Sequence, residues 1–472
     1  MERTSRRPVL RHAQALWLRA RAALDRTLHT DDGEHEHDHG RLLTPLATPT
    51  TSRTRAGEAP ARLDVILVPT SRPAEVTAEG IARAADLAAA HGAVLVLLCS
   101  HAADVEQLAA AGVDREDVAV ALLDVSGPGW RGLLPDFSTT AHRLARRGTW
   151  DTAQKRNLGL VMAAVFGWTW VLFLDDDLTG PERSTGGGLT PDAVSGAIRA
   201  MTTDPGLRLV GWRIPDFPDN SVVCHARRLA DLPQGCFVGA GALLVRFGSD
   251  VPFFPSVYNE DWLFEYGVLR HAGGRRATIG LAGELGQQPY DPFKPARAEV
   301  EECGDVMAEG IFAVVGRGPG AERSILRQAY WEQVIRRRRR MIGQVRLELL
   351  RRRHLAGPYV APPDAGGPSR SSRHVRRAAL ESLERAAGTY TSSERQAGRL
   401  AADIVEFFVL WHDDLRRWRK RMRRPPAAAL HQMLADTGHC RLNAGAKHAL
   451  RPPSDLVVEG ETVDTVGCGA LV

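Results

Sequence analysis

The sequence is poor in cysteine and has no apolar run long enough to cross a membrane. Its 472 residues include six cysteines, too few for a secreted disulfide scaffold and not spaced in the close pairs of a zinc ribbon. The most apolar stretch, Leu158 to Leu174, is shorter than the roughly 20 residues of a membrane span. The Arg-rich N-terminus lacks the positive-then-apolar pattern of a secretory signal. We therefore expect a cytoplasmic protein with reduced thiols and no transmembrane segment.

A strong excess of one charge sign is also missing. The chain has 61 Lys and Arg against 56 Asp and Glu, a formal net charge of +5, so only local clusters can support an argument about anionic partners. There is no GxxxxGK[ST] phosphate loop, and no GxGxxG follows a predicted strand, which excludes the P-loop and dinucleotide-binding classes. With 44% apolar residues, the chain can form a large core in two or three domains.

The pattern of the chain changes near residue 62 and again near residue 320. Residues 1–61 mix Arg and His without periodicity and are predicted to form a mobile arm. Residues 62–320 alternate helix-length segments with short runs of apolar residues at 64–68, 93–98, 118–123 and 170–174. Strands without polar alternation, separated by helices, are typical of a parallel sheet covered on both faces. We predict a doubly wound, mainly parallel α/β domain over residues 62–320.

The C-terminal third shows helical periodicity instead of strand signals. Val334, Met341, Val345 and Leu349 share one helical face, and a second such face runs from Ile404 to Leu415. Residues 321–440 are therefore predicted to be a basic helical region. Residues 441–472 show little pattern and are predicted to be a tail.

The strongest signal for chemistry is the triplet Asp175, Asp176 and Asp177, which follows the apolar run 170–174. Ligands of such sheets bind beyond the carboxyl ends of the strands, and adjacent carboxylates repel one another unless a cation neutralises them. Asp175 and Asp177 point roughly the same way and suit a hard divalent ion that bridges to a diphosphate. The alternative is an acidic turn that caps the next helix.

The triplet belongs to a wider resemblance. An apolar strand that ends in three Asp residues, preceded by Lys155, Arg156 and Asn157 at the start of a helix, resembles the GT-A fold nucleotide-sugar glycosyltransferases, especially family 2. The resemblance spans about residues 63–283 and implies a GT-A-like sheet. It also implies Mg²⁺ or Mn²⁺ on Asp175 and Asp177, with Asp176 nearer the ribose or sugar of a nucleoside diphosphate sugar donor.

Other positions agree with this resemblance. The first strand leads into the segment from Thr70 to Arg72, where such enzymes turn the chain under the nucleotide base, and Asp124 ends the third strand, where they place an acid that binds the base. The cations Arg72, Lys155 and Arg156 suit the charge of a diphosphate. Solvated side chains are the alternative for each one alone.

A second acidic pair, Glu260 and Asp261, opens a predicted helix after the Gly-rich segment 235–241. Acidic residues in a first turn complement the helix dipole, which is the structural alternative. The resemblance to family 2 implies that Asp261 is the general base for an acceptor hydroxyl, with Glu260 either orienting it or contacting the acceptor. A base must come within about 3 Å of the hydroxyl that it activates.

The third metal ligand of many GT-A enzymes, a His, has no clear equivalent here. His271 falls inside a predicted helix, and the segment 287–291 has no His. Water, one of the acids Glu301, Glu302 and Asp305, or His225 remain as alternatives.

Three Arg-rich clusters, at 336–340, 351–353 and 416–424, lie in the predicted helical region. They suit peripheral contact with anionic membrane, nucleic acid or an acidic partner, and a solvated helix face is the alternative. Five consecutive Arg residues span more than one helical turn, so some of this charge must approach the apolar side and needs an acidic or phosphate partner there.

We therefore expect a metal-dependent glycosyltransferase of the hexosyltransferase type, which moves a sugar to the hydroxyl of an unidentified acceptor. If Asp261 is the base, in-line displacement inverts the anomeric centre. The alternatives are a nucleotidyltransferase on the same fold and a non-catalytic anion- or RNA-binding protein that uses the Arg-rich helices.

Overall fold

The computed structural model describes most of the chain between residues 38 and 451. Much of the predicted arm and tail, as well as His271, lies outside the described residues. The described ranges are 38–46, 61–145, 151–180, 188–215, 220–270, 278–288, 290–315, 317, 319–352, 372–390, 394–436 and 438–451.

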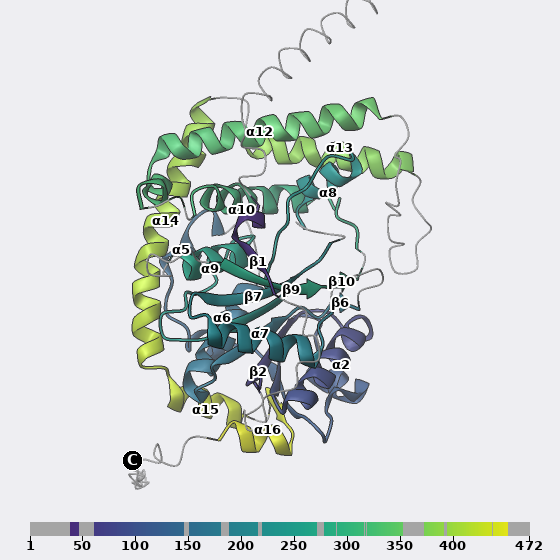
Figure 1. Cartoon of the computed structure of the whole chain (residues 1–472), viewed down its shortest axis with the longest axis vertical. Coiled ribbons are helices and arrows are strands. Elements are labelled where there is room, and N and C mark those ends of the chain that lie inside the picture. The colour runs from purple at the N-terminus through teal and green to yellow at the C-terminus, as the bar shows by residue number, and fades with distance from the viewer. Residues whose placement is uncertain are drawn as a thin grey trace, which may run out of the picture.

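A nine-stranded sheet forms the centre of the molecule (Figure 1). Its order is β1-β9-β7-β8-β5-β2-β3-β4-β11, and a separate pair joins β10 to β6. The strands are β1 Leu43–Pro45, β2 Val65–Thr70, β3 Val94–Cys99, β4 Ala119–Asp124, β5 Trp170–Leu174, β6 Leu178–Thr179, β7 Leu207–Arg213, β8 Ala242–Arg246, β9 Thr278–Glu284, β10 Gly286–Gln287 and β11 Cys440–Leu442.

The sheet is mainly parallel. Every strand pair is parallel except those of β8, which runs antiparallel to β5 and β7, and of β11, which runs antiparallel to β4. The carboxyl ends of β2, β3, β4 and β5 therefore meet at one edge, and β8 begins at that same edge because Ala242 pairs with Leu174.

Helices cover both faces of the sheet. Because successive side chains of a strand point to opposite sides, alternate residues pack into different cores. Val65 and Leu67 of β2 pack into the larger core with α6, whereas Ile66 and Val68 pack into a second core with α2 and α7. The helices of the sheet domain are α2 Ala74–His91, α3 Val105–Leu108, α4 Pro128–Arg131, α5 Ser138–Ala141, α6 Thr152–Phe166, α7 Pro191–Thr203, α8 Val222–Leu229, α9 Glu260–Leu269 and α10 Arg297–Phe312, with the short turns η1 Gly40–Leu42 and η2 Ala109–Val113.

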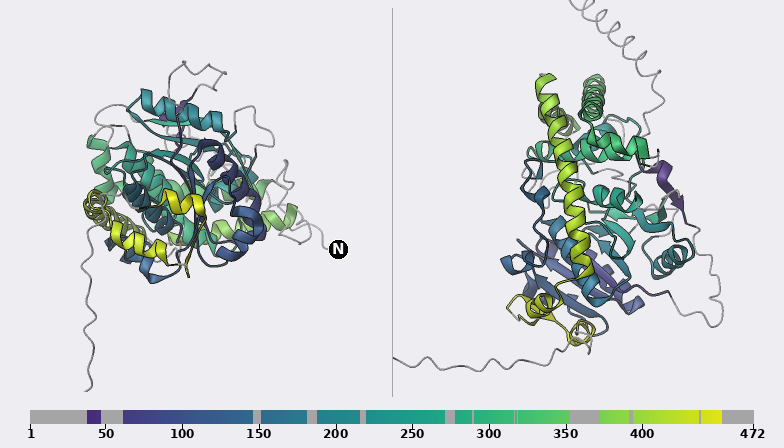
Figure 2. Two further views of the ribbon diagram at one scale, coloured as in Figure 1. Left: turned by 90° about the horizontal axis from the view of Figure 1, so that it is seen from below. Right: turned by 90° about the vertical axis from the view of Figure 1, so that its left-hand side faces the viewer.

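A helical region follows. In Figure 1, α12 and α13 lie at one end of the molecule and α16 at the other, and Figure 2 shows α14 running along one side between them. Val345 and Leu349 of α12 and Phe408 and Trp411 of α14 are buried in the larger core, as the periodicity predicts. The helices are α11 Pro319–Glu322, η4 Arg323–Leu326, α12 Gln328–Arg351, α13 Ser372–Thr389, α14 Glu394–Arg423, α15 Ala427–Ala435 and α16 Ala444–Ala449.

This architecture confirms the predicted fold class, an α/β domain with a mainly parallel sheet followed by a helical region. The division into domains at residues 61, 320 and 440 stays a prediction. Two short segments near the predicted boundaries nevertheless join the sheet: β1, from the predicted arm, pairs with β9, and β11 pairs with β4. Strands of three residues are too short to show a periodicity.

In the described part of the chain, no helix combines the length and the apolar character that crossing a membrane requires. The five cysteines within these ranges carry free thiols, and four of them are buried.

Gly80 of α2 provides a test of how the helices fit the sheet edge. A Cβ at this position would overlap with the backbone carbonyl oxygen of Asp176, so Gly80→Ala must push α2 away from the turn after β5. We expect it to lower the free energy of unfolding by about 1–3 kcal/mol in urea denaturation.

Gly343→Ala on α12 is the matched control, because a Cβ there meets nothing within 4 Å. Replacing this exposed helical glycine should stabilise the protein by about 0.5–1 kcal/mol. Equal stability of the two variants would contradict the close packing of α2.

Candidate functional site

Most of the predicted site residues lie at the carboxyl edge of the sheet. Thr70 ends β2, Asp124 ends β4 and Asp175 follows β5. The antiparallel β8 brings its preceding loop to the same edge, where the backbone N–H of Asp175 donates to the carbonyl of Gly241 at 2.9 Å. The topology therefore brings together groups that are far apart in the sequence.

Arg156 links the acidic triplet to the second acidic pair. It lies on α6 with 4% of its side chain exposed. Its Nη2 donates to Oδ1 of Asp175 at 2.9 Å and its Nη1 to Oε1 of Glu260 at 2.6 Å. One buried guanidinium is thus shared by two carboxylates, as expected for a charge-assisted contact.

This pairing leaves negative charge in excess. Burial raises the pKa of Asp175 to about 7, with Arg156 acting against the shift and the charges of Asp177, Asp176 and Asp261 adding to it. Burial likewise raises the pKa of Glu260 to about 7, again with Arg156 acting against the shift and Asp261 adding to it. The site would accept a further cation.

Asp176 turns toward β2. The hydroxyl of Thr70 donates to its Oδ2 at 2.6 Å, and Nη2 of Arg72 donates to its Oδ1. Only 8% of the Asp176 side chain is exposed, against 36% for Arg72. In this arrangement Asp176 ties the turn after β5 to the end of β2, while Arg72 remains accessible at the edge.

Asp177 is held from the opposite direction. The small sheet of β6 and β10 brings Gln287 to it, and the amide Nε2 of Gln287 donates to Oδ2 at 3.0 Å. Nη1 of Arg72 lies 3.5 Å from the same oxygen. The other oxygen, Oδ1, is buried with no hydrogen-bond partner, and burial raises the pKa of the carboxyl group. An unpartnered buried carboxylate oxygen is a free position for a ligand.

Asp261 contacts the Gly-rich loop before β8. Its Oδ2 accepts from the backbone N–H of Ala240 at 2.9 Å, and a Cβ at Gly239 would stand 2.6 Å from the same oxygen. Glycine is therefore needed at 239 for this approach. The loop that also contacts Asp175 orients the predicted base.

Lys155, the neighbour of Arg156 on α6, has different partners. Its Nζ donates to the carbonyl of Thr70 at 2.7 Å and lies 3.0 Å from Oδ2 of Asp151. Burial lowers the pKa of this amine, with Asp151 acting against the shift. The buried cation is thus anchored between the end of β2 and the start of α6.

A cavity of about 580 Å³ opens beside Lys155, at the ends of β3 and β4. Ligand sites of this size are common in enzymes. Its lining is mixed polar and apolar: Ser100, His101, Val125, Ser126, Trp130, Arg131, Leu134, Thr140, Ala145, Asp151, Gln154, Lys155, Leu158 and Ser256.

Asp124 lies near this cavity but is not among its lining residues. Its Oδ1 accepts from the backbone N–H of Ser126 at 3.0 Å, and Nδ1 of His439 lies 3.6 Å from its Oδ2. Its neighbours Val125 and Ser126 line the cavity instead. The predicted role of Asp124 in binding a nucleotide base stays a prediction.

The candidates for a third metal ligand contact residues other than Asp175 and Asp177. Glu302 and Asp305 form ion pairs with Arg338, and Glu301 pairs with Arg297. His225 is buried, with its Nε2 2.7 Å from the hydroxyl of Tyr290. Within the described ranges, no three His, Cys, Asp or Glu side chains cluster as a metal site would require.

Asp175 and Asp177 nevertheless fit a hard divalent cation. Carboxylate oxygens are its preferred ligands, and the pair offers a buried oxygen without a partner and a carboxyl group whose pKa is raised to about 7. A cation held by two carboxylates completes its coordination with water or with a ligand.

Sequence reasoning did not identify Gln287, Asp151 or the backbone N–H of Ala240. Gln287 contacts Asp177 across 110 positions, and no local pattern signals such a contact. Asp151 precedes Lys155 by four residues, the spacing of a helical ion pair, and this signal could have found it.

Comparisons with known proteins gave distant structural matches. No family model and no curated protein matches the chain. It is similar to glucosyl-3-phosphoglycerate synthase from Mycobacterium tuberculosis in complex with Mn²⁺, UDP-glucose and glycerol 3-phosphate, with 16% identity over 56% of this chain and 88% of that chain and a TM-score of 0.33. A complex of the same enzyme with Mn²⁺, UDP-glucose and phosphoglyceric acid gives 16% identity, the same coverage and a TM-score of 0.35. At these values residue roles must come from the geometry of this chain.

Removing Arg156 tests the charge balance of the site. Arg156→Met leaves Asp175 and Glu260 without their shared cation, and in buffer with EDTA we expect a loss of about 3–5 kcal/mol in the free energy of unfolding at pH 8. A carboxyl group with a raised pKa binds its proton more tightly in the folded state, so it favours folding at low pH and loses this contribution as pH rises toward 7. The loss should therefore shrink at pH 5.5.

Arg377→Met removes an exposed ion pair with Glu381 and serves as the control, with an expected change of about 0–1 kcal/mol at both pH values. A deficit of Arg156→Met that stays constant from pH 5.5 to 8 would contradict the shared-cation arrangement.

Proposed function

We propose that this protein is a metal-dependent glycosyltransferase that moves a sugar from a nucleoside diphosphate to a hydroxyl acceptor. The observation that carries the proposal is the acidic site at the sheet edge, where the charge of Asp175 and Asp177 is not fully compensated. Asp261 contacts the same loop before β8 that contacts Asp175. Such a site suits a cation, and a diphosphate is a ligand that the cation would hold. Mg²⁺ and Mn²⁺ are the candidate ions.

The cavity beside Lys155 supports a nucleoside site next to this metal site. Lys155 borders the cavity and also contacts the carbonyl of Thr70, whose hydroxyl binds Asp176. Lys155 and Thr70 thus connect the cavity to the acidic edge, and a nucleoside bound in the cavity would have its phosphates on that side. Arg72 and Lys155 would supply positive charge near its phosphates, and the bound ion would neutralise the departing diphosphate.

Asp261 is the proposed general base. Its position on the first turn of α9 and its hydrogen bond from Ala240 fix the carboxylate near Asp175. A carboxylate at this place can take the proton from an acceptor hydroxyl as the hydroxyl attacks the anomeric carbon. Glu260, held by Arg156, would orient the first turn. Attack from the face opposite the leaving group gives inversion, and the transferred group is proposed to be a hexosyl unit.

The Arg-rich alternative receives less support from the described residues. Arg338 is fully buried in an internal ion-pair cluster, Arg352 pairs with Asp231 and Glu348, and Arg416 pairs with Asp413. These pairs reduce the charge available to nucleic acid or lipid. Peripheral membrane contact stays a prediction, and so does the cytoplasmic location.

The donor site is tested by isothermal titration with UDP and GDP, with and without Mn²⁺. We expect one nucleotide to bind, more tightly with Mn²⁺, and the Mn²⁺-dependent part of its affinity to disappear in Asp177→Asn, which removes one of the two proposed metal ligands. Asp192→Asn, a change of an exposed acid on α7, is the control and should bind as the unmodified protein does. Equal Mn²⁺ dependence in the two variants would argue against the metal site.

The base is tested by turnover. With UDP-glucose as the first donor, we expect Asp261→Asn to retain nucleotide affinity but to lower the rate of transfer or of donor hydrolysis roughly 10²- to 10⁴-fold, the usual contribution of a general base. The measurement is the release of UDP over time, with binding followed separately by titration. A variant that keeps its full rate would remove Asp261 from this role.

A further inference from the structure

Asn259, the residue directly before Glu260, has an uncommon backbone conformation. It is the N-cap of α9 and adopts the left-handed region with φ of 60° and ψ of 38°. Asparagine tolerates this region better than most residues. Its side chain makes no cap hydrogen bond to α9 and instead donates through Nδ2 to Oδ1 of Asp305 at 2.8 Å. An outside contact therefore fixes the start of the helix that carries Asp261.

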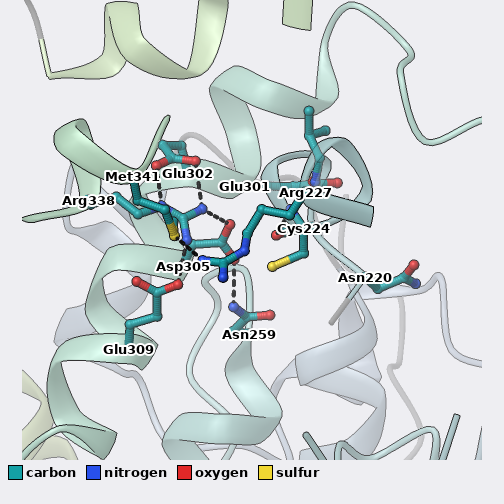
Figure 3. Close-up of polar contacts among 12 residues, drawn as sticks. Asn220, Cys224, Arg227, Asn259, Glu301, Glu302, Asp305, Glu309, Arg338 and Met341 are labelled. Atoms are coloured by element: carbon teal, nitrogen blue, oxygen red, sulfur yellow. Dashed lines mark hydrogen bonds and ion pairs between the residues drawn. The ribbon is translucent and has the colours of Figure 1, made fainter. Parts of the chain in front are cut away.

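Asp305 links Asn259 to the helical region. It is buried on α10, and its Oδ2 accepts from Nη2 of Arg338 on α12 at 2.7 Å. Figure 3 shows Arg338 reaching into a group of acids from α10, with the dashed contact of Asn259 at the lower edge of the same group. Two hydrogen bonds thus join α12 to the N-cap of α9.

Arg338 is itself rigidly held. Its Nε and Nη2 donate to the two oxygens of Glu302 at 2.7 and 3.0 Å, and its Nη1 donates to Glu309. None of the Arg338 side chain is exposed. The hydroxyl of Tyr390, just after α13, donates to Glu302 as well. Bidentate guanidinium pairs of this kind fix direction as well as charge.

Backbone packing acts at the same point. A Cβ at Gly304 of α10 would overlap with the carbonyl oxygen of Tyr258, so α10 lies directly against the chain before Asn259. Gly304 and Asp305 are consecutive residues, and they contact Tyr258 and Asn259 respectively. The chain segment before α9 is therefore held in place by α10, through a backbone contact and a side-chain hydrogen bond.

We propose that Arg338 is a positioning residue that, through Asp305 and Asn259, sets the left-handed N-cap of α9 and with it the direction of the Asp261 carboxylate. This inference rests on the proposed role of Asp261 as general base. It gives the C-terminal helical region a part in catalysis without contact with substrate. Displacing a catalytic group by about 1 Å can cost roughly 10²-fold in rate, so such a link would show in turnover.

The first experiment is a double-mutant cycle with Arg338→Met and Asn259→Gly. Glycine adopts the left-handed conformation freely but cannot contact Asp305, so Asn259→Gly removes the link and spares the backbone. With UDP-glucose as donor and water as acceptor, we expect each change to lower kcat for UDP release at least tenfold with little change in KM. The double variant should be no slower than the slower single variant, because both changes interrupt one path.

Arg346→Met is the matched control, since Arg346 lies on the same helix in an exposed pair with Glu384. It should leave kcat unchanged. Effects that multiply in the double variant, or that appear in KM instead of kcat, would overturn the proposal. Arg338→Lys, which keeps the charge but not the bidentate contact, should fall between the unmodified protein and Arg338→Met.

A second measurement is independent of turnover. Hydrogen–deuterium exchange should quicken at least tenfold at residues 258–263 in Arg338→Met and in Asn259→Gly, while α6 exchanges as before. A uniform increase along the chain would mean general destabilisation and would overturn the positioning role. If the localised effect is present but neither UDP-glucose nor GDP-mannose is turned over by the unmodified protein, the proposed glycosyl transfer fails while the coupling of Arg338 to α9 stands.

Discussion

The contact on which the rest of the site depends is the buried guanidinium of Arg156 between Asp175 and Glu260. It joins α6, the end of β5 and the start of α9 at one point, and only 4% of the Arg156 side chain is exposed. Burial raises the pKa of Asp175 and of Glu260 to about 7, the charges of neighbouring acids add to the shift, and Arg156 offsets it only in part. A chain selected for stability alone would not keep such a cluster.

The surrounding structure limits how this cluster can relax. Glycine at 239 and 241 allows the loop before β8 to reach Asp261 and Asp175, and glycine at 80 allows α2 to lie on the carbonyl of Asp176. The first two approaches place the loop against the carboxylates of Asp261 and Asp175, and the third packs α2 against the backbone of the turn after β5. Protonation or the binding of a cation would relieve the repulsion among these acids.

The sequence predicted the strands of the fold and the sheet edge of the candidate site better than it predicted the contacts between side chains. Apolar runs identified β2, β3, β4 and β5, and the rule for parallel sheets predicted that Asp175 lies at their carboxyl edge, where the structure has it. The helical positions of Lys155 and Arg156 are local too, and so is the contact of Lys155 with Asp151, but Glu260 meets Arg156 across 104 positions. Contacts such as that of Gln287 depend on β6 and β10, which are too short to leave a pattern.

The acidic cluster of α10 and the acidic site at the sheet edge differ in how their carboxylates are partnered. Glu302, Asp305 and Glu309 occupy one face of α10, at the spacing i, i+3 and i+7, and the sequence left Glu302 and Asp305 among the alternatives for a third metal ligand. The run 336–340 also required one Arg to face inward, and in the fold Arg338 meets these acids. In that cluster one guanidinium faces three carboxylates, each of which accepts a hydrogen bond from Arg338, and the cluster serves as structure. Asp175 and Asp177 end a strand at the sheet edge, where Asp177 keeps a buried oxygen without a partner. What separates the two clusters is this unpartnered carboxylate oxygen, and the cluster that keeps it is the one positioned to take a ligand from outside.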